Sequence, residues 1–556
     1  MTKGVDIPHK ACYILPMKKI LTGIPDFEAL IQSGDKIYVD KTSYVYQMLG
    51  TGERFFFISR PRRFGKSLMC STLDALFSGK KELFKDLYIG KTDYDFKSHL
   101  VLRFDFSRLN LRSHDTFLSD FQTQVFDNAL RTGISIPCSQ PSSMMDALLK
   151  KLDSPVVIID EFDSPMIDAV AEGEQELAER MRRDFNAFYK VIKSYTGKIR
   201  FLFMTGCTKL SGLSIFSAMN NLNDISTDSR YAGMFGYTEE ELVKYFSEHI
   251  DQKLSTPGSS YSSKEEFLDA LRGYYDGYRF SPFKELRVYN PVSIGKYFSS
   301  EDILFSNYWV MTGGLSTLAV TLARNTDLLS IAEERLTLSI DRLSAFDAAR
   351  VTAGGPSKTE TSCLLYYAGY LTIKDSYKTN VILGFPDTEV RTTFISALVQ
   401  AYSRERDDPQ AIVTDAVCAA ERGDHRAIIG LLNKYYRLFN YKDTEGRQEQ
   451  WVKLLFKAFF GMLSLTVYTE TPGGRGRIDA VMITETSNYV FEFKVDGKSA
   501  DDAMEQIIDR HYDWFFTSSP KPLHLIGIDF STEERQIVSY THMLYGSGEV
   551  EEIAVL

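Results

Sequence analysis

Short apolar runs alternate with helical patterns along the first 210 residues. The runs are rich in Val, Ile or Phe and are bounded by polar residues, Gly or Pro, which is typical of buried strands. They are Arg54–Ser59, Leu100–Ser107, Val156–Asp160 and Ile199–Thr205. Helical patterns lie between them, for example at Ser67–Leu76 and Leu177–Ser194. Because strands that alternate with helices form parallel sheets covered on both faces, we predict an α/β domain here.

The remainder of the chain follows a different pattern. A Ser-, Gly- and Pro-rich loop at Asp251–Ser263 ends the first domain. From residue 264 to 446 the pattern is mostly helical, and it predicts a lid followed by a linker region, with helices at Phe267–Tyr275, Thr392–Arg404 and Asp415–Tyr435. An amphipathic helix at Gln448–Ser464 then leads into a strand-rich tail. We therefore expect domains at 15–250, 264–446 and 447–556.

Composition narrows the class of protein. The chain has 556 residues, of which 44% are hydrophobic and 25% charged, so disorder is excluded as its main state. Its net charge of −10 excludes a histone-like coat for nucleic acid, although it leaves room for a local basic groove. The six cysteines show neither CxxC spacing nor the density of a disulfide scaffold, which indicates a reducing compartment. With no apolar run near ~18 residues we expect no membrane span and a cytoplasmic location.

The first candidate site follows the strand at Arg54–Ser59. The loop there reads RPRRFGKS, and Gly65, Lys66 and Ser67 lead directly into a helix. A helix N-terminus offers unpaired N–H groups and a positive dipole end to a phosphate. Gly65 lets the backbone approach a phosphate, Lys66 would reach the β- and γ-phosphates, and Ser67 would bind Mg²⁺. The motif therefore predicts a site for ATP and Mg²⁺; its alternative is an ordinary helix N-terminus.

This loop departs from the usual phosphate-binding pattern. Arg60 stands where the first glycine is expected, and Pro61 lacks a backbone N–H donor. Arg62 and Arg63 supply positive charge that would compensate in binding the phosphates. Nucleotide binding is therefore expected, whereas hydrolysis is left open by the loop alone.

Two later strands support the nucleotide site. Val156–Asp160 is followed by Glu161, so a buried run ends in two carboxylates. In P-loop ATPases the first acid holds Mg²⁺ and the second polarises the attacking water, roles that fit Asp160 and Glu161. Thr205, at the end of the next strand, is our candidate γ-phosphate sensor. Asp160 ends the third predicted strand when the strand before the RPRRFGKS loop is counted as the first, which is the order expected of the additional-strand class of P-loop ATPases. The alternative is a pair of solvated carboxylates in a loop.

A second candidate site lies near the C-terminus, in a β-hairpin. Strand patterns at Arg477–Thr484 and Tyr489–Val495 flank the four residues ETSN. A symmetric loop would pair Thr484 with Tyr489, which sets Val481 opposite Glu492 and Asp479 opposite Lys494. Directly opposed residues share a face of the sheet, as do residues two apart on a strand.

Asp479, Glu492 and Lys494 are therefore expected on one face. Two carboxylates that are diagonal neighbours on one face of a hairpin lie close enough to share a Mg²⁺ ion. Lys494 would orient or deprotonate a water for attack on a phosphodiester. Gln506, on a helix predicted at Ala503–Asp513, is a further polar candidate. The arginines of the loop TPGGRGR would suit a nucleic-acid backbone, or the loop is a flexible turn. The alternative for the hairpin is an exposed salt-bridge cluster.

With both sites in view, the chain resembles a bacterial family that joins an AAA-ATPase-like domain to a C-terminal PD-(D/E)XK nuclease-like domain. The resemblance runs from about Leu15 to Ser531. It rests on YVDKT, SRPRRFGKSL, VVIIDEFD, FMTGCTKLS, YYDGYRF, YAGYLTI and GRGRID…FEFK. It implies an additional-strand P-loop NTPase domain, a helical middle region and a restriction-endonuclease-like α/β domain. RPRRFGKS resembles the family's own form of the loop, and Ile478 replaces the Pro of the nuclease motif.

These observations lead to one hypothesis and a rival. The first is an ATPase coupled to Mg²⁺-dependent hydrolysis of nucleic acid by the C-terminal domain. The rival is a regulatory or signalling ATPase whose C-terminal domain binds a partner or nucleic acid without cleaving it. A scaffold that binds nucleotide without turnover is a third interpretation. Because AAA-type ATPases often form rings, a homo-oligomer is one expected state. The sequence does not distinguish DNA from RNA as the substrate.

Overall fold

The structure is a computed structural model. It describes residues 17–20, 23, 26–210, 221–256, 261–303, 305–309, 336–347, 357–402, 409–438, 452, 455–456, 458–460, 466–473, 476–497, 499–516, 519–547 and 550–555. The chain divides into two compact units. The first comprises Met1–Ala169 and Glu174–Tyr308, and the second comprises Val170–Gly173 and Trp309–Leu556.

The first unit is built around a five-stranded sheet in the order β2-β3-β4-β1-β5, in which every pairing is parallel. The strands are β1 Phe55–Ser59, β2 Val101–Asp105, β3 Val156–Asp160, β4 Phe201–Gly206 and β5 Asn223–Asp224. Every residue of β1, β3 and β4 is buried, as their continuous apolar runs predict. β4 lies between β1 and β3, which confirms the additional-strand arrangement.

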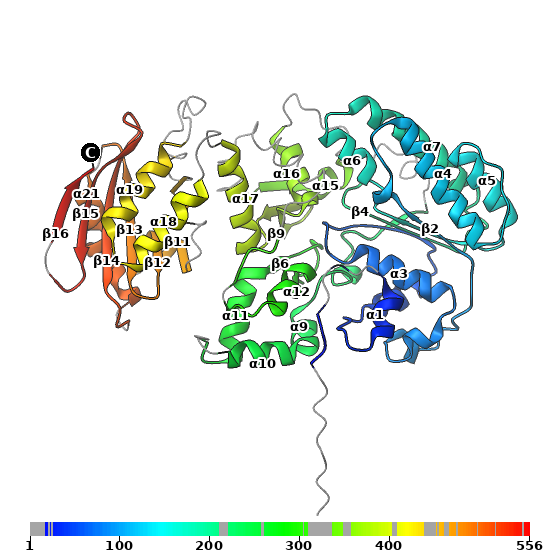
Figure 1. The fold of residues 1–556 in the computed structure, drawn as a ribbon, viewed down its shortest axis with the longest axis horizontal. Helices are drawn as coiled ribbons and strands as arrows, with labels where there is room; N and C mark the ends of the chain where they lie inside the picture. Colours follow the sequence, from blue (N-terminus) through cyan, green and yellow to red (C-terminus); the bar gives the residue numbers. More distant parts are fainter. Residues whose placement is uncertain are drawn as a thin grey trace, which may run out of the picture. The chain divides into compact units, whose positions relative to one another are not determined.

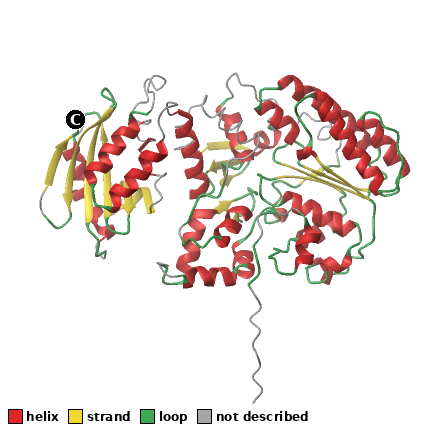
Figure 2. Ribbon diagram, in the orientation of Figure 1, coloured by secondary structure: helices red, strands yellow, loops and turns green. Residues whose placement is uncertain are grey.

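Helices cover both faces of this sheet (Figures 1 and 2), with α4, α5 and α7 on one face and α1 and α3 on the other. Short strands β6 Asp276–Tyr278 and β7 Val288–Tyr289 pair among the helices that follow the sheet. The helices of this unit are α1 Phe27–Ser33, α2 Thr42–Leu49, α3 Lys66–Phe77, α4 His114–Arg131, α5 Pro141–Lys151, α6 Ser164–Ala171, α7 Gln175–Ser194, α9 Glu239–Tyr245, α10 Ser247–Ser255, α11 Lys264–Tyr275 and α12 Pro291–Ser299.

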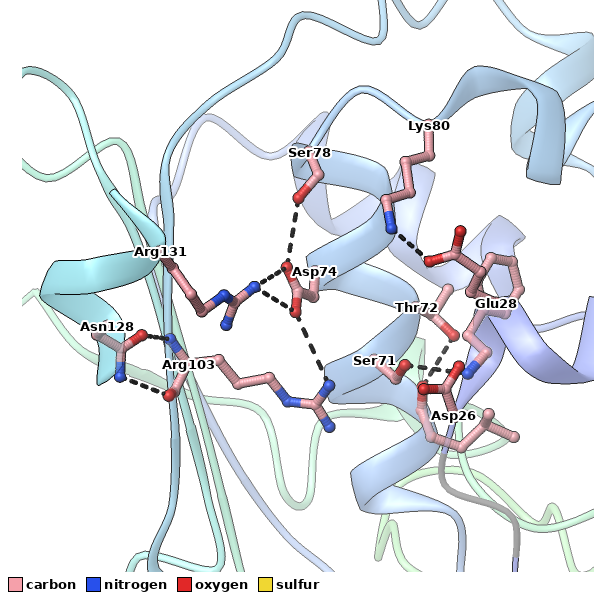
Figure 3. Close-up of polar contacts among 12 residues, drawn as sticks. Asp26, Glu28, Ser71, Thr72, Asp74, Ser78, Lys80, Arg103, Asn128 and Arg131 are labelled. Carbon is pink, nitrogen blue, oxygen red and sulfur yellow. Dashed lines mark hydrogen bonds and ion pairs between the residues drawn. The ribbon is translucent and has the colours of Figure 1, made fainter. Parts of the chain in front are cut away.

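Polar contacts fix α3, the helix that follows the RPRRFGKS loop, to its neighbours (Figure 3). Asp74 on α3 receives Arg131 from α4 at 3.3 Å and Arg103 from β2 at 3.8 Å. Asn128 on α4 bonds both the backbone N–H and the carbonyl of Arg103, at 2.7 and 2.8 Å. The backbone N–H of Phe27 on α1 donates to Ser71 of α3 at 3.0 Å. The helix is therefore held along its length, and its N-terminus has a defined position.

The second unit begins with a small antiparallel sheet in the order β8-β10-β9. Its elements are β8 Leu336–Ser339, α15 Ile340–Ala345, α16 Lys358–Ala368, β9 Thr372–Tyr377, β10 Asn380–Gly384 and α17 Thr388–Tyr402. The pattern from residue 264 to 446 predicts mostly helix and does not predict this sheet. The helical pattern at Asp415–Tyr435 is interrupted, because Gly423 has φ of 71° and Asp424 caps a new helix.

A six-stranded sheet in the order β11 to β16 forms the C-terminal part of this unit. β13 and β14 are parallel and are joined through α21, whereas the other neighbours are antiparallel. One face packs against α21, and the other contributes to a core with α18 and α19. The elements are α18 Pro409–Glu421, α19 His425–Tyr436, β11 Thr466–Gly473, β12 Gly476–Ile483, β13 Asn488–Val495, α21 Ala500–Asp509, β14 Leu523–Ser531, β15 Gln536–Leu544 and β16 Val550–Ala554.

Two sequence predictions fall largely outside the described residues. They are the amphipathic helix at Gln448–Ser464 and the side chains of the TPGGRGR loop. Among the described residues, no helix combines the length and apolar character that crossing a bilayer requires.

Candidate functional site

The RPRRFGKS loop joins β1 to the N-terminus of α3. Gly65 is the N-cap of α3 and has φ of 91°, a conformation that other residues adopt only with strain. Lys66 and Ser67 are the first two residues of the helix. The loop therefore presents the unpaired N–H groups of a helix N-terminus, which is the geometry that binds a phosphate.

Lys66 is buried within this loop. Its ammonium group donates to the carbonyls of Arg60 at 3.0 Å and Pro61 at 3.1 Å, and lies 3.5 Å from Sγ of Cys207. Burial lowers the pKa of Lys66, but the charges of Cys207, Glu161 and the nearby Asp side chains more than offset this, so the net pKa is raised. Lys66 is therefore a buried cation that spans the loop.

Arg60 occupies the position of the first glycine in the usual phosphate-binding loop, and its side chain points away from the loop. It is 2% exposed and donates to the carbonyl of Ser226 at 2.7 Å. Its guanidinium carbon lies 4.2 Å from the ring centroid of Phe280. Because the side chain is held in the protein interior, its bulk does not occupy the phosphate-facing side of the loop.

The two other arginines of the loop differ in their contacts. Arg62 on the loop lies 3.4 Å from Asp168, an ion pair with α6. Arg63 is half-buried and has φ of 71°, so its backbone adopts a left-handed conformation. Neither position tests the predicted contact with phosphate, which stays a prediction.

Asp160, Glu161 and Thr205 meet where β3 and β4 end. The Thr205 hydroxyl donates to the buried Asp160 carboxylate at 2.5 Å and accepts from the backbone N–H of Glu161 at 3.3 Å. Glu161 has φ of 49°, and burial raises the pKa of its carboxyl. The interpretation of Asp160 and Glu161 as solvated loop carboxylates is therefore not favoured, because Asp160 is buried at the end of β3 and Glu161 follows it in a hydrogen-bonded, largely buried turn.

Sequence reasoning missed Asp163 at this site. Its buried carboxylate accepts from the backbone N–H groups of Cys207, at 3.0 and 3.1 Å, and of Thr208, at 2.6 Å. It also accepts from the Thr208 hydroxyl at 2.9 Å. Burial raises the pKa of Asp163 despite these bonds. Asp163 thus fixes the segment after β4, and the second Asp of VVIIDEFD was the available signal.

The hairpin of the C-terminal sheet has a different register from the one predicted. Thr484 and Ser487 close a tight turn, with the N–H of Thr484 donating to the carbonyl of Ser487 at 2.9 Å. Val481 consequently pairs with Val490, and the prediction that it faces Glu492 is wrong by two residues. A shift of two residues keeps each side chain on its predicted face. Continuing the ladder sets Asp479 beside Glu492 rather than opposite Lys494.

Glu492 is the centre of this second site and is 3% exposed. Its Oε1 atom receives Lys494 at 3.1 Å and is also bonded by the amide of Gln506 from α21. Lys494 donates to Gln506 at 2.7 Å. Burial, together with the charge of Asp479, raises the pKa of Glu492 to about 7 against the opposing effect of Lys494. Glu492, Lys494 and Gln506 therefore contact one another, and the charge of Asp479 acts on the same carboxyl.

Two contacts position the acids. Asp479 accepts a hydrogen bond from the backbone N–H of Phe493 at 2.8 Å, which holds its carboxylate against β13. Gly527 of β14 is paired with Glu492, and a Cβ there would lie 2.5 Å from the carbonyl oxygen of Ala500. Because Gly527 has no side chain, α21 lies close enough to the sheet for Gln506 to reach Glu492.

The residues of the two sites fit the groups that their chemistry implies. Oε2 of Glu492 is buried without a hydrogen-bond partner among the described residues, beside a second carboxylate. A divalent cation would satisfy that oxygen and relieve the repulsion between the two acids. At the other site the helix N-terminus, Lys66 and the Asp160–Thr205 pair fit a nucleoside triphosphate with Mg²⁺.

Comparisons with known proteins identify the types of domain in which the two candidate sites lie. Residues 21–216 match the family described as "Predicted AAA-ATPase", and residues 447–540 match the PD-(D/E)XK nuclease superfamily. The chain is also similar to a protein of Azotobacter chroococcum mcd 1 described as an uncharacterized protein in the vnfD 5′ region. The two are 29% identical over 538 residues, which cover 94% of this chain and 98% of that protein. The chain therefore combines an AAA-ATPase-like domain with a C-terminal domain of the PD-(D/E)XK nuclease superfamily.

Proposed function

We propose that the C-terminal domain is a Mg²⁺-dependent nuclease. The observation that carries this proposal is the convergence of Asp479, Glu492 and Lys494 on one face of the hairpin, with Glu492 buried and one of its oxygens without a partner. An exposed salt-bridge cluster would not bury a carboxylate whose pKa is raised to about 7. A metal site explains why the chain keeps these charges inside.

In this proposal Asp479 and Glu492 hold the cation, which when bound stabilises the charge that develops on the phosphodiester. The hydrogen bond from Phe493 orients Asp479, and the contact with Gln506 orients Glu492. Lys494 orients the attacking water or takes its proton, and Gln506 fixes the lysine for that role at 2.7 Å. Nucleic acid is the proposed substrate.

The test is metal-dependent cleavage of a mixed panel of single- and double-stranded DNA and RNA. We expect wild type to cleave with Mg²⁺ and the Asp479→Ala variant to lose at least 100-fold in rate. Glu505→Gln, which changes an exposed carboxylate on α21, is the matched control and is expected to cleave like wild type. Cleavage that persists in Asp479→Ala would contradict the assignment. Absence of cleavage by wild type with any divalent metal would favour the rival function, a C-terminal domain that only binds.

We propose that the N-terminal domain binds ATP with Mg²⁺ and hydrolyses it. Lys66, Gly65 and the α3 N-terminus, with Arg62 and Arg63 nearby, would hold the phosphates, and Ser67 and Asp160 would hold the cation. Glu161 would polarise the water and Thr205 would sense the γ-phosphate. The bonds of Thr205 to both Asp160 and Glu161 support this assignment. Coupling of hydrolysis to cleavage is part of the proposal.

Phosphate release tests the ATPase. We expect Lys66→Ala to lose nucleotide binding, and Glu161→Gln to bind ATP but release phosphate at least 100-fold more slowly. Equal phosphate release by Glu161→Gln and wild type would show that the domain is a nucleotide-binding scaffold without turnover at this site.

We also propose a cytoplasmic location, which suits an ATP-dependent enzyme with free cysteines such as Cys70, Cys207 and Cys363. The domain limits 15–250, 264–446 and 447–556 remain proposals. The core of the C-terminal sheet also includes α18 and α19, which precede residue 447.

A further inference from the structure

Three histidines gather on the C-terminal sheet, on the face opposite the Asp479 site. His524 lies on β14 and His542 on β15, while His425 is the first residue of α19. His524 is paired in parallel register with Tyr489 and stacks on its ring, whereas Glu492 and Gly527 face α21. The cluster thus takes three of the eight histidines in the chain and is separate from the proposed nuclease site.

The ring nitrogens of the cluster lie close together. Nδ1 of His524 is 3.0 Å from Nε2 of His542. The ring of His425 covers that of His542, with centroids 3.7 Å apart and planes inclined by 13°. Glu551 of β16 is the cross-strand partner of His542, and His425, His542 and Glu551 each offer one ligand atom within 4.8 Å of the others.

Burial disfavours the protonated form of all three imidazoles. For His524 and His542, burial and the neighbouring imidazoles together lower the pKa to about 4. Burial also lowers the pKa of His425, with Arg426 adding to the effect and Glu551 opposing it. The neutral imidazole is the form that binds a metal ion, because one ring nitrogen keeps its lone pair.

A hydrogen-bonded histidine cluster without a metal is the alternative. A distance of 3.0 Å between His524 and His542 suits an N–H···N bond. It is also near the spacing of about 3.3 Å between two nitrogens on a tetrahedral Zn²⁺ with bonds of about 2.0–2.1 Å. The carboxylate beside the imidazoles favours the metal. Arg426 contacts one oxygen of Glu551, and a carboxylate can hold an arginine and a metal ion through different oxygens.

We propose that His425, His542 and Glu551, with His524 as the fourth ligand, form a structural site for a transition-metal ion of the Zn²⁺ class. Imidazole with carboxylate ligands suits Zn²⁺, Co²⁺ or Ni²⁺, whereas Mg²⁺ prefers oxygen ligands. Binding requires the stacked rings of His425 and His542 to turn until both nitrogens face the ion. The ion would join the N-terminus of α19 to β14, β15 and β16.

Co²⁺ titration of the tag-free, full-length protein tests this site, because tetrahedral Co²⁺ absorbs visible light. Millimolar Mg²⁺ is present throughout to fill the oxygen-ligand sites. We expect one equivalent of Co²⁺ to bind, Zn²⁺ to displace it, and His542→Ala to weaken binding at least tenfold. His511→Ala, which removes an exposed histidine of the same domain, is the matched control and is expected to bind like wild type.

A further variant and a second measurement guard against misfolding and misassignment. His425→Gln changes a half-buried residue at a helix end, so it serves if His542→Ala does not fold. Asp479→Ala is expected to bind Co²⁺ like wild type, and Zn²⁺ is expected to raise the melting temperature of wild type but not of His542→Ala. Absence of tetrahedral Co²⁺ in wild type, or equal affinity in wild type, His542→Ala and His425→Gln, would overturn the proposal.

Discussion

The raised pKa of Glu492 predicts how metal binding at the proposed nuclease site depends on pH. Burial and the neighbouring Asp479 raise the pKa of this carboxyl from 4.5 to about 7. A metal ion binds the ionised carboxylate, so a proton and the ion compete for Glu492. Lowering the pH from 8 to 6 therefore weakens metal binding in a range where an ordinary glutamate stays ionised.

The size of the effect follows from the pKa. With a pKa of about 7, the factor by which protonation of Glu492 weakens metal binding rises from about 1.1 at pH 8 to about 11 at pH 6. The apparent dissociation constant should rise by the same ratio, about tenfold, which corresponds to about 1.4 kcal/mol. The metal-free fold should also lose stability as the pH rises from 4.5 to about 7, since the native state binds this proton more tightly than the unfolded state does.

Isothermal titration with Mn²⁺, performed without nucleotide, measures this dependence. Wild type should bind about tenfold more weakly at pH 6 than at pH 8. Glu505→Gln should follow wild type, and Glu492→Gln should lose the pH-dependent binding. Equal affinity of wild type at pH 6 and pH 8 would refute the assignment of Glu492 as a buried metal ligand with a raised pKa.

Three further substitutions test other parts of the account. Arg60→Gly should lower the melting temperature, because it removes buried charge-assisted hydrogen bonds and a contact with an aromatic ring, together worth about 3 kcal/mol. An unchanged melting temperature would contradict a stabilising role for the buried Arg60 side chain. Thr205→Val should slow ATP hydrolysis about 100-fold while ATP still binds, and phosphate release at the wild-type rate would contradict this. Gly527→Ala should cost about 1–3 kcal/mol and slow cleavage, whereas wild-type values for both would show that α21 tolerates a Cβ.

The sequence predicted the parts of the fold that depend on local patterns. The strands β1, β3 and β4 carry nearly continuous apolar runs, β2 is mostly apolar, and each strand lies where its run predicts, within one or two residues. The P-loop candidates also follow from local order, since Gly65 must cap α3 if the loop is to turn tightly. Asp479, Glu492 and Lys494 could be assigned to one face because side chains alternate along a strand.

Other features depend on contacts between distant residues. The hairpin register was wrong by two residues because the Thr484 side chain, which accepts from the N–H groups of Ser487 and Thr486, closes a tighter turn than the assumed loop. The role of Arg60 depends on Ser226 and Phe280, which no local pattern connects to it. The histidine cluster likewise forms only when α19 packs on the sheet.

We propose that the two domains act together as an ATP-dependent, metal-dependent nuclease. The most direct test of this proposal is the rate of nucleic-acid cleavage by the full chain in Mg²⁺, with and without ATP, for wild type, Asp479→Ala and Lys66→Ala. We expect ATP to change the wild-type rate, Lys66→Ala not to respond to ATP, and Asp479→Ala not to cleave in either condition. Cleavage that is identical in all three proteins, or absent from wild type although wild type binds ATP, would contradict this proposal.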